Sequence, residues 1–147
     1  MRVYLYYIGH PRDAHANAMA EEYIKRTGRY LACEMREIRP ARFDPWARHP
    51  AATTVLLDDA GRGMDSGAFT ALVSRTEREG RDLVFLIGGA DGPPPGWKER
   101  AGLLLSLSPL TFPHEFARVV LAEQLDRAMV SWSSASSTSL MSSLPSG

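Results

Sequence analysis

Short apolar runs alternate along this chain with segments of helical spacing. The runs at residues 3–8, 53–57, 83–87 and 103–107 are rich in branched and aromatic side chains, which is typical of buried strands. Residues 31–38 alternate apolar with charged side chains and predict a more exposed strand. Each run ends near Gly, Pro, Asp or Ser, the residues that favour turns.

The segments between these strands have the pattern of amphipathic helices. Apolar side chains recur at three- and four-residue intervals, Asp13 is placed to cap the first helix, and Gly28 and Gly80 follow two of them as stop signals. Alternating strands and helices predict an α/β fold with a mostly parallel sheet. We expect loop structure at residues 41–54 and a polar turn at 58–63. The predicted helices cover residues 14–26, 66–79, 97–101 and 114–129.

The composition is ordinary except at the end of the chain. A length of 147 residues, with 44% hydrophobic and 23% charged residues, fits one globular domain. Residues 131–147 contain nine serines and no charged side chain, too little apolar surface to offset the entropy cost of ordering. We therefore expect one domain over residues 1–130 and a flexible Ser-rich tail over 131–147.

The distribution of charge limits the class of partner. Seventeen basic and seventeen acidic residues give zero net charge, which argues against a free-standing nucleic-acid binder held by bulk attraction. Residues 1–48 carry nine basic and six acidic side chains, whereas 49–147 carry eight and eleven. The N-terminal third therefore presents the more basic surface, and RNA stays open as a partner.

Neither a metal nor a membrane is expected. The single Cys33 cannot form an internal disulfide, and four scattered histidines offer no zinc set, which favours a reducing, cytoplasmic setting. Asp58 and Asp59 follow a strand but lack a third ligand at useful spacing, so a solvated turn is the better interpretation. No apolar run approaches the ~20 residues that cross a bilayer.

Two loops carry candidate chemistry. The first, residues 88–96, is a glycine-rich segment after a buried strand, where open α/β sheets bind ligands; a plain tight turn explains this motif equally well. The second, residues 108–114, contains two prolines and opens the last helix, so it predicts a rigid wall or an ordinary helix start. His114 at that start is a candidate proton acceptor or a cap. Arg118, on an apolar helix, is a partner of Glu115 or Glu123 or a phosphate contact.

The order, spacing and content of three segments resemble the RlmH-type family of SPOUT methyltransferases. The segments are residues 83–92, 105–114 and 118–128, and residues 1–40 show a fainter similarity. The resemblance implies a deep trefoil knot, a homodimer, S-adenosylmethionine as methyl donor, and methylation at N3 of a pseudouridine in 23S ribosomal RNA within the assembled ribosome. By the same resemblance, the cofactor contacts fall on Leu57, Gly89, Ser108, Pro109, Leu110, Thr111, Phe112 and Pro113.

Methyl transfer at N3 also requires the loss of a proton, for which His114 is the nearby side chain that we nominate, and Arg118 is the second expected catalytic residue. Two segments depart from the family pattern: residues 41–54 are shorter, and the Ser-rich tail replaces a basic, aromatic one. Two alternatives follow. One is a homologue that binds cofactor or ribosome without turnover, and the other is a flavodoxin-like nucleotide-binding module.

Overall fold

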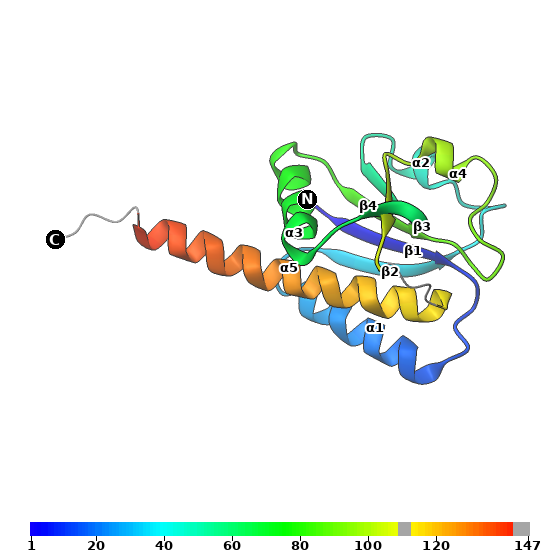
Figure 1. The fold of residues 1–147 in the computed structure, drawn as a ribbon, viewed down its shortest axis with the longest axis horizontal. Coiled ribbons are helices and arrows are strands. Elements are labelled where there is room, and N and C mark those ends of the chain that lie inside the picture. Colours follow the sequence, from blue (N-terminus) through cyan, green and yellow to red (C-terminus); the bar gives the residue numbers. More distant parts are fainter. Residues whose placement is uncertain (109–112, 143–147) are drawn as a thin grey trace.

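Five strands form one sheet in the order β2-β1-β4-β3-β5, and every neighbouring pair is parallel (Figure 1). The computed structural model describes residues 1–108 and 113–142, with residues 132–142 as backbone only. The predicted α/β fold with a parallel sheet is therefore confirmed. The strands are β1 (Val3–Ile8), β2 (Cys33–Ile38), β3 (Thr53–Gly63), β4 (Leu83–Ile87) and β5 (Leu103–Ser106).

The strand order excludes the flavodoxin-like alternative. A flavodoxin-like sheet has the order 2-1-3-4-5, whereas here β4 lies between β1 and β3. β1 therefore pairs with β4, and Val3 lies opposite Leu83 in this pair. A long connection separates the two strands in sequence.

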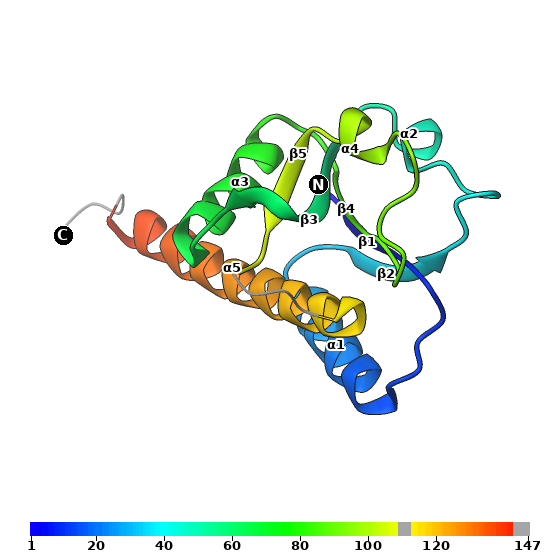
Figure 2. The same cartoon turned by 45° about the vertical axis from the view of Figure 1, so that its right-hand side comes forward.

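Helices cover the two faces of the sheet unequally. α1 (Ala14–Thr27), α3 (Ser66–Arg78) and α5 (His114–Ser142) lie on one side, while the single-turn α2 (Pro45–Arg48) and α4 (Trp97–Arg100) lie on the other (Figures 1 and 2). The last turns of α5 project beyond the body of the protein. Over the described residues, no helix has the length and apolar character needed to span a membrane.

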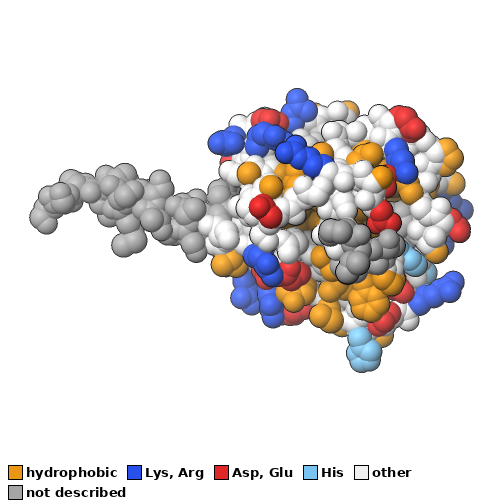
Figure 3. Space-filling view, viewed as in Figure 1, with side chains coloured by type: hydrophobic (Ala, Val, Ile, Leu, Met, Phe, Trp, Pro, Cys, Tyr) orange, Lys and Arg blue, Asp and Glu red, His pale blue; other side chains and the backbone are white. Residues whose placement is uncertain are grey.

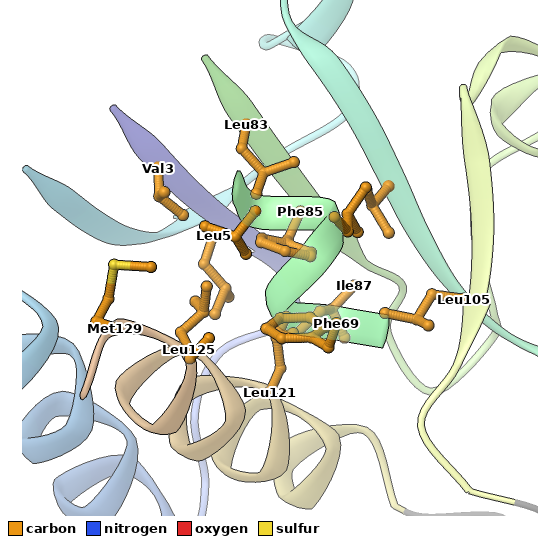
Figure 4. Close-up of a cluster of buried hydrophobic side chains, with 14 residues drawn as sticks. Val3, Leu5, Phe69, Leu83, Phe85, Ile87, Leu105, Leu121, Leu125 and Met129 are labelled. Carbon is orange, nitrogen blue, oxygen red and sulfur yellow. The ribbon is translucent and has the colours of Figure 1, made fainter. Parts of the chain in front are cut away.

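The main core lies beneath α3 and α5 (Figure 4). Side chains that alternate along β1 and β4, such as Leu5 and Phe85, point to this face and are fully buried. Phe85 stacks on Phe69 of α3 with ring centroids 5.8 Å apart. Small residues let α1 and α5 approach closely, since Ala20 and Ala122 are both inaccessible to solvent.

Three elements differ from the sequence-based expectation. The segment expected as loop at 41–54 contains α2, with Asp44 as its N-cap. The expected turn at 58–63 continues β3, which shifts register against β5 between Leu57 and Arg62. The last helix runs to Ser142 instead of ending at Met129.

The Ser-rich segment therefore begins as helix, while residues 143–147 lie outside the described part of the chain. The flexibility expected of this tail stays a prediction, as does the trefoil knot.

Candidate functional site

A cavity of about 180 Å³ opens at the carboxyl edge of the sheet. The middle of β3, the segments that follow β4 and β5, and the first turn of α5 form its walls. Because the strands are parallel, their carboxyl ends meet at this one edge, which is where open α/β sheets bind ligands. The lining includes Leu57, Asp58, Asp59, Gly88, Gly89, Ser108 and His114.

The glycine loop forms its wall from backbone atoms. A Cβ on Gly88 would lie 2.8 Å from the carbonyl carbon of Gly92, which is closer than real contacts allow. Gly92 has φ +83° and its N–H donates to the carbonyl of Gly89 at 3.0 Å. A Cβ on Gly89 would lie 3.3 Å from the carbonyl oxygen of Ile8. The loop therefore folds back tightly, and a ligand can approach its main chain directly.

Asp58 brings a fixed negative charge to the opposite wall. The Ala60 N–H donates to its carboxylate at 3.1 Å, and Lys98 Nζ lies 3.1 Å from Oδ2. These two partners, the Ala60 N–H first, hold the pKa of Asp58 below its ordinary value. Residues 1–108 and 113–142 contain no group of three or more His, Cys, Asp or Glu side chains suited to a metal ion. The cavity therefore presents carboxylates rather than a metal centre over its described lining.

His114 is held in place by its neighbour in sequence. Glu115 Oε1 accepts the N–H groups of Asp13 at 3.0 Å and Arg12 at 2.6 Å, and these bonds lower the pKa of Glu115. The first turn of α5 is thereby tied to the loop after β1. On that loop, a Cβ on Gly9 would lie 3.9 Å from His114 Nε2, so the imidazole fills the space that glycine leaves.

Comparison with known proteins assigns the chain to a family. The family described as "Predicted SPOUT methyltransferase" matches residues 1–132. The chain belongs to the SPOUT methyltransferase family. A relative from Solibacter usitatus, named "Ribosomal RNA large subunit methyltransferase H", is 62% identical over 127 residues, which cover 86% of this chain and 91% of the relative. A protein of the same name from Sorangium cellulosum is 44% identical and covers 88% of this chain and 93% of its own length. The resemblance seen in the sequence is confirmed.

A solved structure has a similar fold at low sequence identity. A probable methyltransferase from Bordetella pertussis superposes with a TM-score of 0.59 at 13% identity, covering 87% of this chain and 94% of that one. At such identity the likeness concerns the fold alone. It agrees with the α/β architecture described above.

The structure brings together part of the cofactor set expected for a SPOUT methyltransferase. Leu57, Gly89 and Ser108 all line the cavity. Pro113 is exposed and outside the described lining. Residues 109–112, that is Pro109, Leu110, Thr111 and Phe112, lie outside the described residues. The roles of the whole set stay predictions.

Of the two residues expected to be catalytic, His114 lines the cavity and Arg118 does not. Arg118 is 1% exposed and lies between α1 and α5, where its Nη1 donates to Asn17 Oδ1 at 2.7 Å. Its guanidinium sits 4.2 Å from the centre of the Tyr7 ring. Glu115 and Glu123, the two expected partners of Arg118, bind other groups. Glu115 accepts backbone N–H groups, and Glu123 pairs with Arg127 at 2.6 Å.

The burial of Arg118 gives it a structural role in joining α1, β1 and α5. Its Nη2 is buried without a hydrogen-bond partner in the described part of the chain. An arginine on an apolar helix predicts a costly buried cation, but no local pattern points to Asn17 as its partner, because Asn17 lies 101 positions away. The structure also adds Asp58 and Asp59 to the site, on walls where sequence reasoning placed a solvated turn.

Proposed function

We propose that this chain methylates N3 of a pseudouridine in 23S ribosomal RNA, using S-adenosylmethionine and acting on the assembled ribosome in the cytoplasm. The observation that carries the proposal is the cavity at the carboxyl edge, where Leu57, Gly89, Ser108 and His114 meet in a member of the SPOUT family. The names of its relatives support a large-subunit RNA as substrate.

The cavity suits the chemistry of this cofactor. Its glycine-loop backbone and the apolar side chain of Leu57 fit a flat adenine, which needs apolar surface and main-chain hydrogen bonds. The cofactor also carries a sulfonium and an ammonium group, and the cavity wall holds two carboxylates, Asp59 and an Asp58 that already pairs with Lys98. When bound, it supplies an activated methyl group for in-line displacement.

The residues of the chain then have two tasks. The rigid glycine loop and the start of α5 orient the two reactants, which is the main source of rate in a direct transfer. The attacking nitrogen must also lose its proton. His114 is the histidine of the described lining, and an imidazole nitrogen can accept a proton, so its side chain is the proposed acceptor.

Calorimetry with S-adenosylmethionine and S-adenosylhomocysteine tests the cofactor site. We expect both to bind the wild-type chain, and Gly89→Val to abolish binding because its branched side chain fills space only 3.3 Å from the Ile8 carbonyl. Gly63→Val is the matched control for glycine replacement, because Gly63 is exposed, lies outside the cavity lining, has no positive φ and has open space around it. Binding of FMN or ATP without response to either sulfur compound contradicts the proposal.

A homodimer belongs to the same proposal. Phe116 and Met19 are 48% and 51% exposed on α5 and α1, and hydrophobic side chains gather over these two helices on one face (Figure 3). An exposed apolar face next to the cavity suits a self-complementary two-fold contact. Light scattering at tens of micromolar should report a dimer that Phe116→Glu dissociates and the distant Tyr30→Glu does not. A monomeric wild-type protein contradicts this part of the proposal.

The Ser-rich segment bears on turnover rather than on the cofactor. Serine cannot replace the stacking and phosphate contacts of a basic, aromatic tail, so we expect normal cofactor binding and slow methylation of ribosomes. The test compares this chain with one whose residues 131–147 are replaced by a family-like tail, on ribosomes from a strain without the enzyme. Equal rates for the two chains contradict the expectation and make the tail dispensable.

A further inference from the structure

Three arginines lie at the carboxyl edge of the sheet, beside the cavity. Arg12 follows β1, and Arg39 and Arg42 follow β2 on the turn that leads to α2. All three are exposed, and none has an ion pair or side-chain hydrogen bond within the described residues. Because β1, β2 and β4 are neighbours and parallel, their carboxyl ends share one edge with the glycine loop.

Contacts of the loop after β1 connect the three arginines to the part of the cavity wall that His114 forms. The backbone N–H of Arg12 donates to Glu115 at 2.6 Å, directly beside His114. On the same loop, His10 Nδ1 lies 3.3 Å from Glu37 Oε1 of β2, which joins the two loops side by side. The arginines therefore continue the surface that begins at His114.

The acidic residues on these loops are already engaged. Asp13 accepts the N–H groups of His15 and Ala16 as the cap of α1. Asp44 accepts the N–H of Trp46 and pairs with Arg100 at 3.5 Å. Within the described residues neither carboxylate forms an ion pair with the three arginines, so their guanidinium groups are left for an external anion.

The turn that carries two of the arginines is fixed before any ligand arrives. The carbonyl of Arg39 accepts the N–H groups of Arg42 at 2.9 Å and Phe43 at 3.0 Å. The Phe43 ring packs on Tyr6 of β1 at 4.9 Å, and the guanidinium of Arg36 lies 5.4 Å above it. A preformed turn loses less entropy on binding, which favours affinity.

We propose that Arg12, Arg39 and Arg42 bind the phosphate backbone of the RNA whose target nucleoside enters the cavity. The inference rests on the proposed function and adds the surface that holds the substrate. Guanidinium groups that are exposed and free of carboxylates suit phosphate oxygens. A nucleoside bound at His114 has flanking phosphates that extend along the same edge.

The experiment compares two triple variants of the full chain. The first is R12Q/R39Q/R42Q at the carboxyl edge. The second is R29Q/R75Q/R78Q, which removes the same charge from exposed arginines near the carboxyl ends of α1 and α3. Because these helices run antiparallel to the strands, their carboxyl ends lie at the opposite, amino edge of the sheet. Exposed substitutions of this kind leave stability nearly unchanged, which thermal unfolding verifies.

Binding to purified large ribosomal subunits is measured over a range of salt concentrations. We expect the carboxyl-edge variant to bind about tenfold more weakly and to reduce the slope of log K against log salt by about two, since each lost phosphate contact removes about 0.7 to 0.9. The amino-edge variant should bind as the wild type does. Equal affinities and slopes for the two variants overturn the inference.

Calorimetry with S-adenosylhomocysteine separates this inference from the proposed function. Both variants should keep wild-type cofactor affinity. If the wild-type chain binds cofactor and ribosomes and the carboxyl-edge variant keeps both, the surface alone is wrong. If the wild-type chain fails to bind cofactor, the proposed function fails. Cofactor binding without ribosome binding overturns the RNA surface and leaves the cofactor site standing.

Discussion

The two faces of the sheet are built by different means. On one, the helices α3 and α5 cover a core of aliphatic side chains and phenylalanines that is almost free of polar atoms. On the other, α2 and α4 have four residues each, and the core mixes aliphatic side chains with the aromatic rings of Tyr6 and Trp97. This second face keeps polar groups inside, among them a Tyr6 hydroxyl 2.7 Å from His49 Nε2.

The difference bears on stability, because the first face buries many more side chains than the second. Both faces contribute to the site, since α5 of the first face lines the cavity and α4 of the second supports its wall. Lys98 of α4, for example, pairs with Asp58 in the cavity wall. Substitutions on the first face should therefore cost more in the free energy of unfolding than equivalent ones on the second.

The largest effect is expected from Phe85→Ala. Phe85 is 0% exposed, so its loss leaves a cavity that lowers the free energy of unfolding by about 3 to 5 kcal/mol. Phe43→Ala is the matched change on the second face, where the ring is only half-buried, and its cost should be smaller. Urea unfolding of both variants measures the difference. Equal losses contradict the distinction between the faces.

A middle-sized effect is expected from Tyr6→Phe. Burial is the main cause that raises the pKa of Tyr6 to about 12, so its hydroxyl stays protonated and forms a hydrogen bond with His49 Nε2. Removing it should cost about 1 to 2 kcal/mol because His49 loses a buried partner. Tyr4→Phe is the control, since Tyr4 contacts His49 through its ring, with the two ring centroids 4.3 Å apart and the planes tilted. A loss as large in Tyr4→Phe argues against the hydrogen bond as the cause.

The smallest effect is a dependence of stability on pH. Burial first, and then the charge of Arg48, lower the pKa of His49 below 6.5, so the unfolded chain binds a proton more readily than the folded one. Stability from this group is complete above pH about 6.5 and falls as the pH drops from there towards the folded-state pKa. Unfolding between pH 5 and 8, approximate limits around that ordinary pKa, should show a shallower decline in His49→Gln. If the free energy of unfolding of His49→Gln falls with pH as steeply as that of the wild type, the pH dependence belongs to other groups.

Features that depend on residues close together in the chain are the ones that the sequence predicts well. β4 is a continuous apolar run, and all five of its residues are buried. The cap at Asp13 depends on neighbours two and three residues away, and it forms as expected. Such features follow from local spacing, so most of the first face and the α/β order could be predicted.

Features set by distant partners could not be predicted in the same way. α2 is too short to show periodicity, and its Trp46 packs on Trp97 at 5.7 Å, a contact between segments far apart in sequence. β3 continues past Leu57 because its last residues pair with β5 again in a shifted register, with Arg62 opposite Leu105. In the site, the glycine loop and His114 follow from motifs, whereas the pairing of Arg118 with Asn17 depends on how α1 meets α5.

The bond between Glu115 and the loop after β1 has a consequence for the order of folding. It joins positions 103 residues apart, and β1 also waits for β4 before it has a second neighbour in the sheet. Contacts of such long sequence separation form late, because the intervening chain must first be gathered. During synthesis, the first strand therefore emerges long before its partners. We expect the cavity wall at His114 to assemble only after the final helix has left the ribosome, so that a nascent chain gains its ligand site at the last step.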